Sequence, residues 1–109
     1  MVNIMCMCPR PRPEARAAVR KCLTEGDFVE SIHFRQRLAE LGEEKGVTIQ
    51  DVTHIGQHGG IYCEPEFDTK YGEWKYRLEG TSADGLLIAL IFCLKEDDLA
   101  LLITIFVQR

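Results

Sequence analysis

Two apolar runs near the C-terminus constrain this chain more than any other feature. Residues 86–94 and 99–107 are nine residues each, and the four charged residues 95–98 separate them. Each run is much shorter than the roughly 20 apolar residues that a membrane-spanning helix needs. Both are rich in Ile, Leu, Phe and Val and end at polar residues, which predicts two strands of a hairpin. A helical hairpin is the alternative, because Leu and Ala favour helices.

The remaining chain has the signals of three helices and one clear strand. A helix is expected over residues 13–25, ending at Gly26, and another over 32–44 with Ser31 as its cap. Residues 28–32 fit either a short strand or the approach to that second helix. Thr48 should cap a third helix that Gly56 ends. Residues 73–79 alternate between apolar and charged side chains, which predicts a half-buried strand.

This order of elements predicts one α+β domain over residues 1–109. We expect two to three N-terminal helices on one face of a three- to four-stranded antiparallel sheet. Residues 1–12, with Pro9 and Pro11, should form an extended or flexible basic arm. Apolar side chains at odd and even positions of the last two strands predict that both sheet faces are covered. A partner protein or a second copy would bury the face without helices.

The net charge of −4 is unevenly distributed. Residues 1–22 hold five basic residues against one acidic residue, a net of +4, so the other 87 residues carry −8. An acidic body is a poor general nucleic-acid binder, because phosphate contacts need Lys and Arg, so such binding would have to use the basic arm or a local patch. Arg12, Arg16 and Arg20 are four residues apart, which predicts a continuous positive ridge on the first helix.

The cysteine pattern predicts reduced thiols in a cytoplasmic protein without a metal or other cofactor. The five cysteines are an odd number, and the N-terminus has no apolar secretory segment. Cys6, Cys8 and Cys22 lack a C-x-x-C pair. His54 and His58 have the i, i+4 spacing of metal ligands, but a helix that ends at Gly56 would separate them. We therefore expect no metal site and no membrane contact.

Three short motifs resemble a bacterial domain of unknown function related to the BrnT, RelE and MqsR toxins. They are residues 33–37 (HFRQR), 46–52 (GVTIQDV) and 76–80 (YRLEG), the last followed by two apolar strands that end in ITIF. The resemblance covers about residues 28–107. Leu41 departs from it, since the family places a second helix arginine there, and Gly46 comes about one turn late.

The resemblance implies a toxin of a toxin–antitoxin system that cleaves RNA without metal and is inhibited by a partner antitoxin, often of the MqsA type. Such cleavage needs a general acid and base and cations on the phosphate. The expected catalytic residues are His33, Arg37 and Arg77, and the expected substrate-binding residues are Lys75, Tyr76 and Thr104.

Non-enzymatic interpretations stand beside this hypothesis. His33 and Arg37 fit a hydrogen-bond network between helix and sheet, and Lys75 and Arg77 alternate with carboxylates as on a solvated strand with ion pairs. The chain would then be a dimerisation or protein-interaction module, or a catalytically inactive relative of the toxins. The partners to consider are an antitoxin, RNA and a second copy of the chain.

Overall fold

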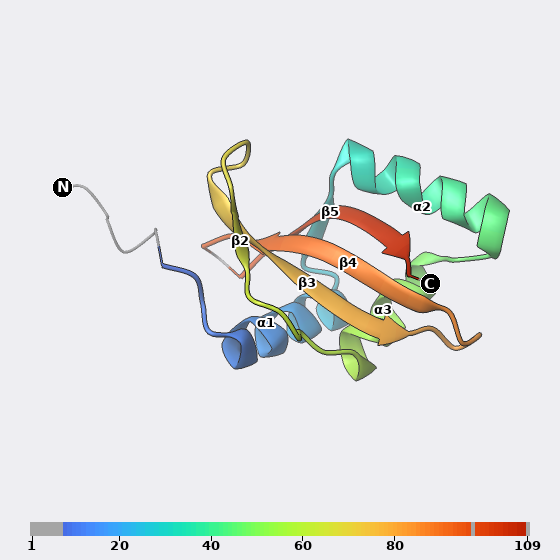
Figure 1. The fold of residues 1–109 in the computed structure, drawn as a ribbon, viewed down its shortest axis with the longest axis horizontal. Helices are drawn as coiled ribbons and strands as arrows, with labels where there is room; N and C mark the ends of the chain where they lie inside the picture. Colours follow the sequence, from blue (N-terminus) through green and yellow to red (C-terminus); the bar gives the residue numbers. More distant parts are fainter. Residues whose placement is uncertain (1–7, 97, 109) are drawn as a thin grey trace.

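The computed structural model describes residues 8–96 and 98–108, which form three helices and a five-stranded sheet (Figure 1). In chain order the elements are α1 (Arg12–Glu25), β1 (Phe28–Glu30), α2 (Ile32–Lys45), α3 (Ile49–His58), β2 (Glu66–Asp68), β3 (Glu73–Thr81), β4 (Leu87–Leu94) and β5 (Ala100–Val107). The strand order is β1-β5-β4-β3-β2. β1 is parallel to β5, and the other neighbours are antiparallel.

The α+β class is confirmed, but the predicted antiparallel sheet of three to four strands is wrong, because the sheet has five strands and β1 is parallel to β5. The two additional strands, β1 and β2, form the edges of the sheet and have three residues each. Such short segments are too brief to show an alternation of apolar and polar residues. Both interpretations of residues 28–32 hold, since β1 ends at Glu30 and the Ser31 hydroxyl accepts a hydrogen bond from Phe34 N at the start of α2.

The two apolar runs form the centre of the sheet, as predicted. β4 and β5 pair along their length, with β3 on the other side of β4. Even-numbered residues of β4, such as Leu90, point to the helices, and odd-numbered ones, such as Ile91, point to the opposite face. This central position explains why both faces of β4 are apolar.

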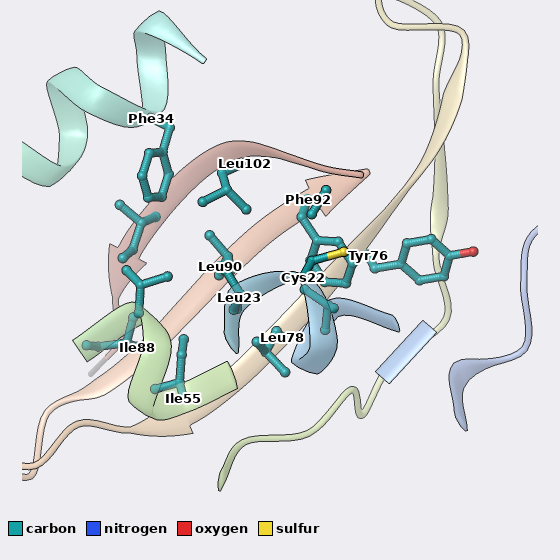
Figure 2. Close-up of a cluster of buried hydrophobic side chains, with 14 of the residues drawn as sticks. Cys22, Leu23, Phe34, Ile55, Tyr76, Leu78, Ile88, Leu90, Phe92 and Leu102 are labelled. Carbon is teal, nitrogen blue, oxygen red and sulfur yellow. The ribbon is translucent and has the colours of Figure 1, made fainter. Parts of the chain in front are cut away.

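The main core lies between the sheet and the helices (Figure 2). α2 packs along β5, α3 packs on β3, and α1 contacts α3 and the central strands. Phe34 of α2, Ile55 of α3 and Leu78 of β3 are fully buried in this core. Each helix therefore contributes to one cluster, which fixes the helices on the sheet without a second core.

α3 does not end at Gly56 as predicted; it continues to His58. Gly56 is buried where α3 crosses α1, and a Cβ added there would lie 2.7 Å from Leu23 Cδ1 and 3.2 Å from Leu23 Cβ. The glycine is needed for close approach of two helices, not for a left-handed turn. The Asp51 carboxylate accepts a hydrogen bond from Thr48 N at 2.9 Å, as expected for the start of α3.

The predicted positive ridge on α1 is interrupted, because two of its three arginines are engaged within the chain. Arg16 donates hydrogen bonds to the carbonyl oxygens of Gly56, Gln57 and Gly59 at the end of α3. Arg12 lies 3.5 Å from a carboxylate oxygen of Glu64.

Only part of the predicted N-terminal arm can be compared with the structure. Residues 1–7, which include Cys6, lie outside the described residues. The described part of the arm is extended before α1, and it is tied to the sheet because Arg10 N donates to the Tyr76 hydroxyl at 2.7 Å.

Candidate binding site on the open face of the sheet

The sheet has one face without helices, which we call the open face. Ala89, Cys93 and Ile103 are buried on this face but do not belong to the main core. Their burial comes from neighbouring strands and from long side chains that lie across the sheet. The open face is formed by Val29, Glu66, Asp68, Glu73, Lys75, Arg77, Glu79, Ala89, Ile91, Cys93, Leu101, Ile103, Thr104 and Phe106.

A polar cluster around Arg77 covers one end of the open face. Arg77 Nη2 donates to Gln108 Oε1 at 2.6 Å, and Gln108 Nε2 donates to Glu79 Oε1 at 3.0 Å. The guanidinium also lies over the Phe106 ring, 5.1 Å from its centre. Glu79, Ala89 and Phe106 are cross-strand neighbours, so the small Ala89 leaves room for these side chains. The chain thus supplies part of the cover that the sequence seemed to require from a partner.

One buried hydrogen-bond donor of Arg77 has no acceptor among the described residues. Its Nε is buried and lies 3.2 Å from Glu79 Oε2, yet the geometry does not give a hydrogen bond. The ion pair therefore neutralises the charge of Arg77 while leaving this donor unsatisfied.

Ion pairs and a buried thiol occupy the other end of the open face. Lys75 Nζ lies 3.7 Å from Asp68 Oδ2, and Lys95 pairs with Glu73. Burial raises the pKa of the Cys93 thiol to about 11, and the nearby Asp68 acts in the same direction. The thiol is protonated at neutral pH, so Cys93 is not a nucleophile.

Between the two ends lies a cavity of about 250 Å³. Its floor is a cross-strand row of Arg77, Ile91 and Thr104, because these residues pair directly across β3, β4 and β5. Ile91 pairs with Thr104 while Phe92 pairs with Leu102, so Ile103 is the extra residue of a β-bulge and also lines the cavity.

The wall of the cavity comes from the segment between α3 and β2. Cys63, Glu64 and Glu66 line the cavity from this side, and Cys63 is exposed. Gly60 pairs with Glu79 and Glu66 pairs with Lys75, so the segment between them must arch away from β3. No sequence pattern indicates this wall, since Cys63, Glu64 and Glu66 acquire their position only from these two pairings.

Four of the six predicted site residues line this cavity. Lys75, Arg77 and Thr104 do so from the open face. Tyr76 also borders the cavity, but its ring is buried in the main core and stacks on Phe92 with 5.5 Å between the ring centres (Figure 2). The Tyr76 side chain is therefore not placed to bind a substrate in this cavity.

The other two predicted residues, His33 and Arg37, lie on α2 and do not line the cavity. His33 is exposed and makes no hydrogen bond or ion pair with any described residue. Arg37 pairs with Glu40 one turn further along the helix. The alternative of a hydrogen-bond network from these residues to the sheet is also not observed among the described residues.

No protein-family model, curated protein or solved structure matches this chain. The resemblance to the toxin families therefore depends on the three short motifs alone. Within the described ranges no helix is long and apolar enough to cross a membrane. The same ranges contain no group of three or more His, Cys, Asp or Glu side chains arranged to hold a metal ion.

Proposed function

We propose that this chain is a non-enzymatic interaction module that binds a second copy of itself through the open face. The observation that carries the proposal is the cavity, in which Ile91 and Ile103 supply an apolar part and charges of both signs form the border. At about 250 Å³ it is slightly smaller than typical small-molecule pockets, which start near 300 Å³. A cavity of this size suits one inserted side chain of a protein partner.

The apolar part of this surface continues from the cavity to the edge of the sheet. Ile91 on the floor is half-buried, and so are Leu101 and Phe106 on β5. Val29 on the edge strand β1 pairs with Leu101 and is 49% exposed. A partially exposed apolar strip with a polar border is typical of a protein–protein contact.

The charges favour a second copy as the partner. Two-fold symmetric contacts need a surface that complements itself, because each patch meets its own equivalent. The cavity carries two carboxylates, Glu64 and Glu66, and two cations, Lys75 and Arg77. Because both signs are present in equal number, this surface would not repel its own equivalent across a two-fold axis.

The same charges speak against an anionic substrate. Lys75 and Arg77 each have a carboxylate partner within the chain, so a phosphate would have to compete with Asp68 and Glu79. The carboxylates of the wall would also repel it. No imidazole lines the cavity to act as general acid or base near neutral pH.

Measurement of molar mass over a concentration series by sedimentation or light scattering tests the proposal. We expect a dimer for the natural chain, and a shift to monomer for Val29→Glu, which places a charge in the contact. Ile49→Glu is the matched control, because Ile49 is also an exposed apolar residue but lies at the start of α3, on the helix side of the sheet. A natural chain that stays monomeric to millimolar concentration would refute the proposal.

Metal-independent RNA cleavage is a second candidate, since the side chains of Lys75, Arg77 and Thr104 are gathered at one cavity. Incubation of the purified chain with a mixed RNA pool, without divalent ions, tests this candidate. Cleavage that Arg77→Gln abolishes and His33→Gln does not affect would favour a toxin whose site excludes α2. Intact RNA would remove the candidate.

A further inference from the structure

We propose that His54 and His58 form a binding site for a divalent transition-metal ion on the last turns of α3. The site lies outside the open face and does not depend on the proposed function. It rests on the course of the helix, the free imidazole nitrogens and the hollow in front of the two rings.

α3 is continuous through Gly56 and ends at His58, so the two histidines are one turn apart on the same side of one helix. Their ring centres are 4.6 Å apart and their planes are tilted by 45°. Histidines with this i, i+4 spacing on a helix provide two ligands to one zinc ion in known metal sites. The spacing has this meaning only because the helix does not stop at Gly56.

Neither imidazole is engaged elsewhere in the described chain. The rings of His54 and His58 contact each other, but their nitrogen atoms make no hydrogen bond or ion pair with a described residue. His54 is half-buried and His58 is exposed. Both rings therefore offer nitrogen atoms that a metal ion can reach without breaking an existing interaction.

The helix end that carries the pair is held in place. The three carbonyls bound by Arg16 belong to Gly56, Gln57 and Gly59, which surround His58. Fixed ligands lose little conformational freedom when they bind a metal. The charge of Arg16 opposes a cation, so the affinity must come from coordination bonds and not from general electrostatic attraction.

The rings border a surface hollow of about 590 Å³, which Tyr62 and Ser82 also line. The described residues contain no group of three or more His, Cys, Asp or Glu side chains that could hold a metal ion. The two imidazoles would therefore be the protein ligands, and water would fill the remaining coordination positions. Imidazole is a suitable ligand for zinc, copper and nickel. The general order of affinity of divalent metals for such ligands then places Cu²⁺ above Ni²⁺ and Ni²⁺ above Co²⁺.

The test is an NMR titration of the isotope-labelled full chain with nickel chloride, observed at the histidine ring protons. Below one equivalent of Ni²⁺, the signals of His54 and His58 should broaden together while that of His33 stays sharp. His33 is the internal control because it is an exposed helical histidine without a neighbouring imidazole. Equal broadening of all three, or broadening of none, would overturn the proposal.

Variants provide the second readout. His54→Gln and His58→Gln should each weaken Ni²⁺ binding by roughly 10-fold or more, since even loss of an outer-shell partner costs about 10- to 100-fold. His33→Gln should leave the affinity unchanged. Far-UV circular dichroism checks that each variant keeps its helices. An unchanged affinity in either α3 variant would assign the metal to other groups, such as the cysteines.

Discussion

Arg16 is the side chain whose removal should reveal most about how the helices are held together. Its guanidinium joins α1 to the end of α3 through hydrogen bonds from Nε to Gly59 O (2.7 Å), Nη1 to Gly56 O (2.8 Å) and Nη2 to Gln57 O (3.0 Å). The last carbonyls of a helix have no partner within the helix, so they need such donors. Burial is the main cause that lowers the pKa of Arg16, with repulsion from Arg20 next.

The expected loss of stability for Arg16→Ala is about 2 kcal/mol. Two of the three bonds are half-buried, and a hydrogen bond to a charged group contributes roughly 1.5–3 kcal/mol. We take the lower end because the side chain is partly solvated, and give the exposed third bond no weight. Releasing the long side chain returns about 1–1.5 kcal/mol of conformational entropy. The result corresponds to a fall in melting temperature of about 10 °C for a domain of this size.

Urea denaturation followed by circular dichroism measures this loss. Arg20→Ala is the matched control on the same helix, because Arg20 is exposed and lies near Arg16 only as a like charge. Its stability should stay within about 0.5 kcal/mol of the natural chain. Arg16→Lys should fall between the two, since an ammonium group cannot reach three carbonyls with a planar fork. An Arg16→Ala variant as stable as Arg20→Ala would refute this account of the helix end.

Three further predictions concern packing and thiol chemistry. Gly56→Ala should destabilise the chain by about 1 kcal/mol, although alanine favours helix, because the new methyl group collides with the buried Leu23; unchanged urea denaturation would contradict this. At pH 8 iodoacetamide should modify Cys63 but neither Cys22 nor Cys93, whose pKa values are raised by burial, as mass spectrometry of peptides can show. The free energy of unfolding should also fall as pH rises from about 9 towards 11, because the Cys93 thiol loses its proton in the unfolded chain before it does so in the folded chain. The Cys93→Ala variant should show a smaller fall over the same pH range.

Local signals in the sequence were sufficient for the regular elements. The apolar runs, the alternation in β3 and the caps at Ser31 and Thr48 act within a few residues, so they can be read without knowledge of the rest of the chain. The α+β class followed from the order of these elements. The edge strand β2 escaped this reasoning, and β1 was predicted only as one of two alternatives, because three residues carry no period.

The candidate site could be predicted only in part. Lys75, Arg77 and Thr104 were expected to act together, and they line one cavity because β3, β4 and β5 are adjacent and in register. His33 was expected beside them, but α2 lies along β5 and the cavity is lined without it. Spacing along a chain determines which residues share a helix or strand, and it does not determine which elements face one another.

The sequence by itself determined the type and approximate position of the three helices and the three long strands, because caps, turns and periodicity are local interactions. Only the tertiary structure decided the role of Gly56, the use of Arg16 as a cap for another helix and the hydrogen bond from Arg77 to Gln108. Arg16 and Gly59 are 43 residues apart, and Arg77 and Gln108 are 31 apart. Contacts over such separations depend on the packing of whole elements, and therefore no local pattern could specify them.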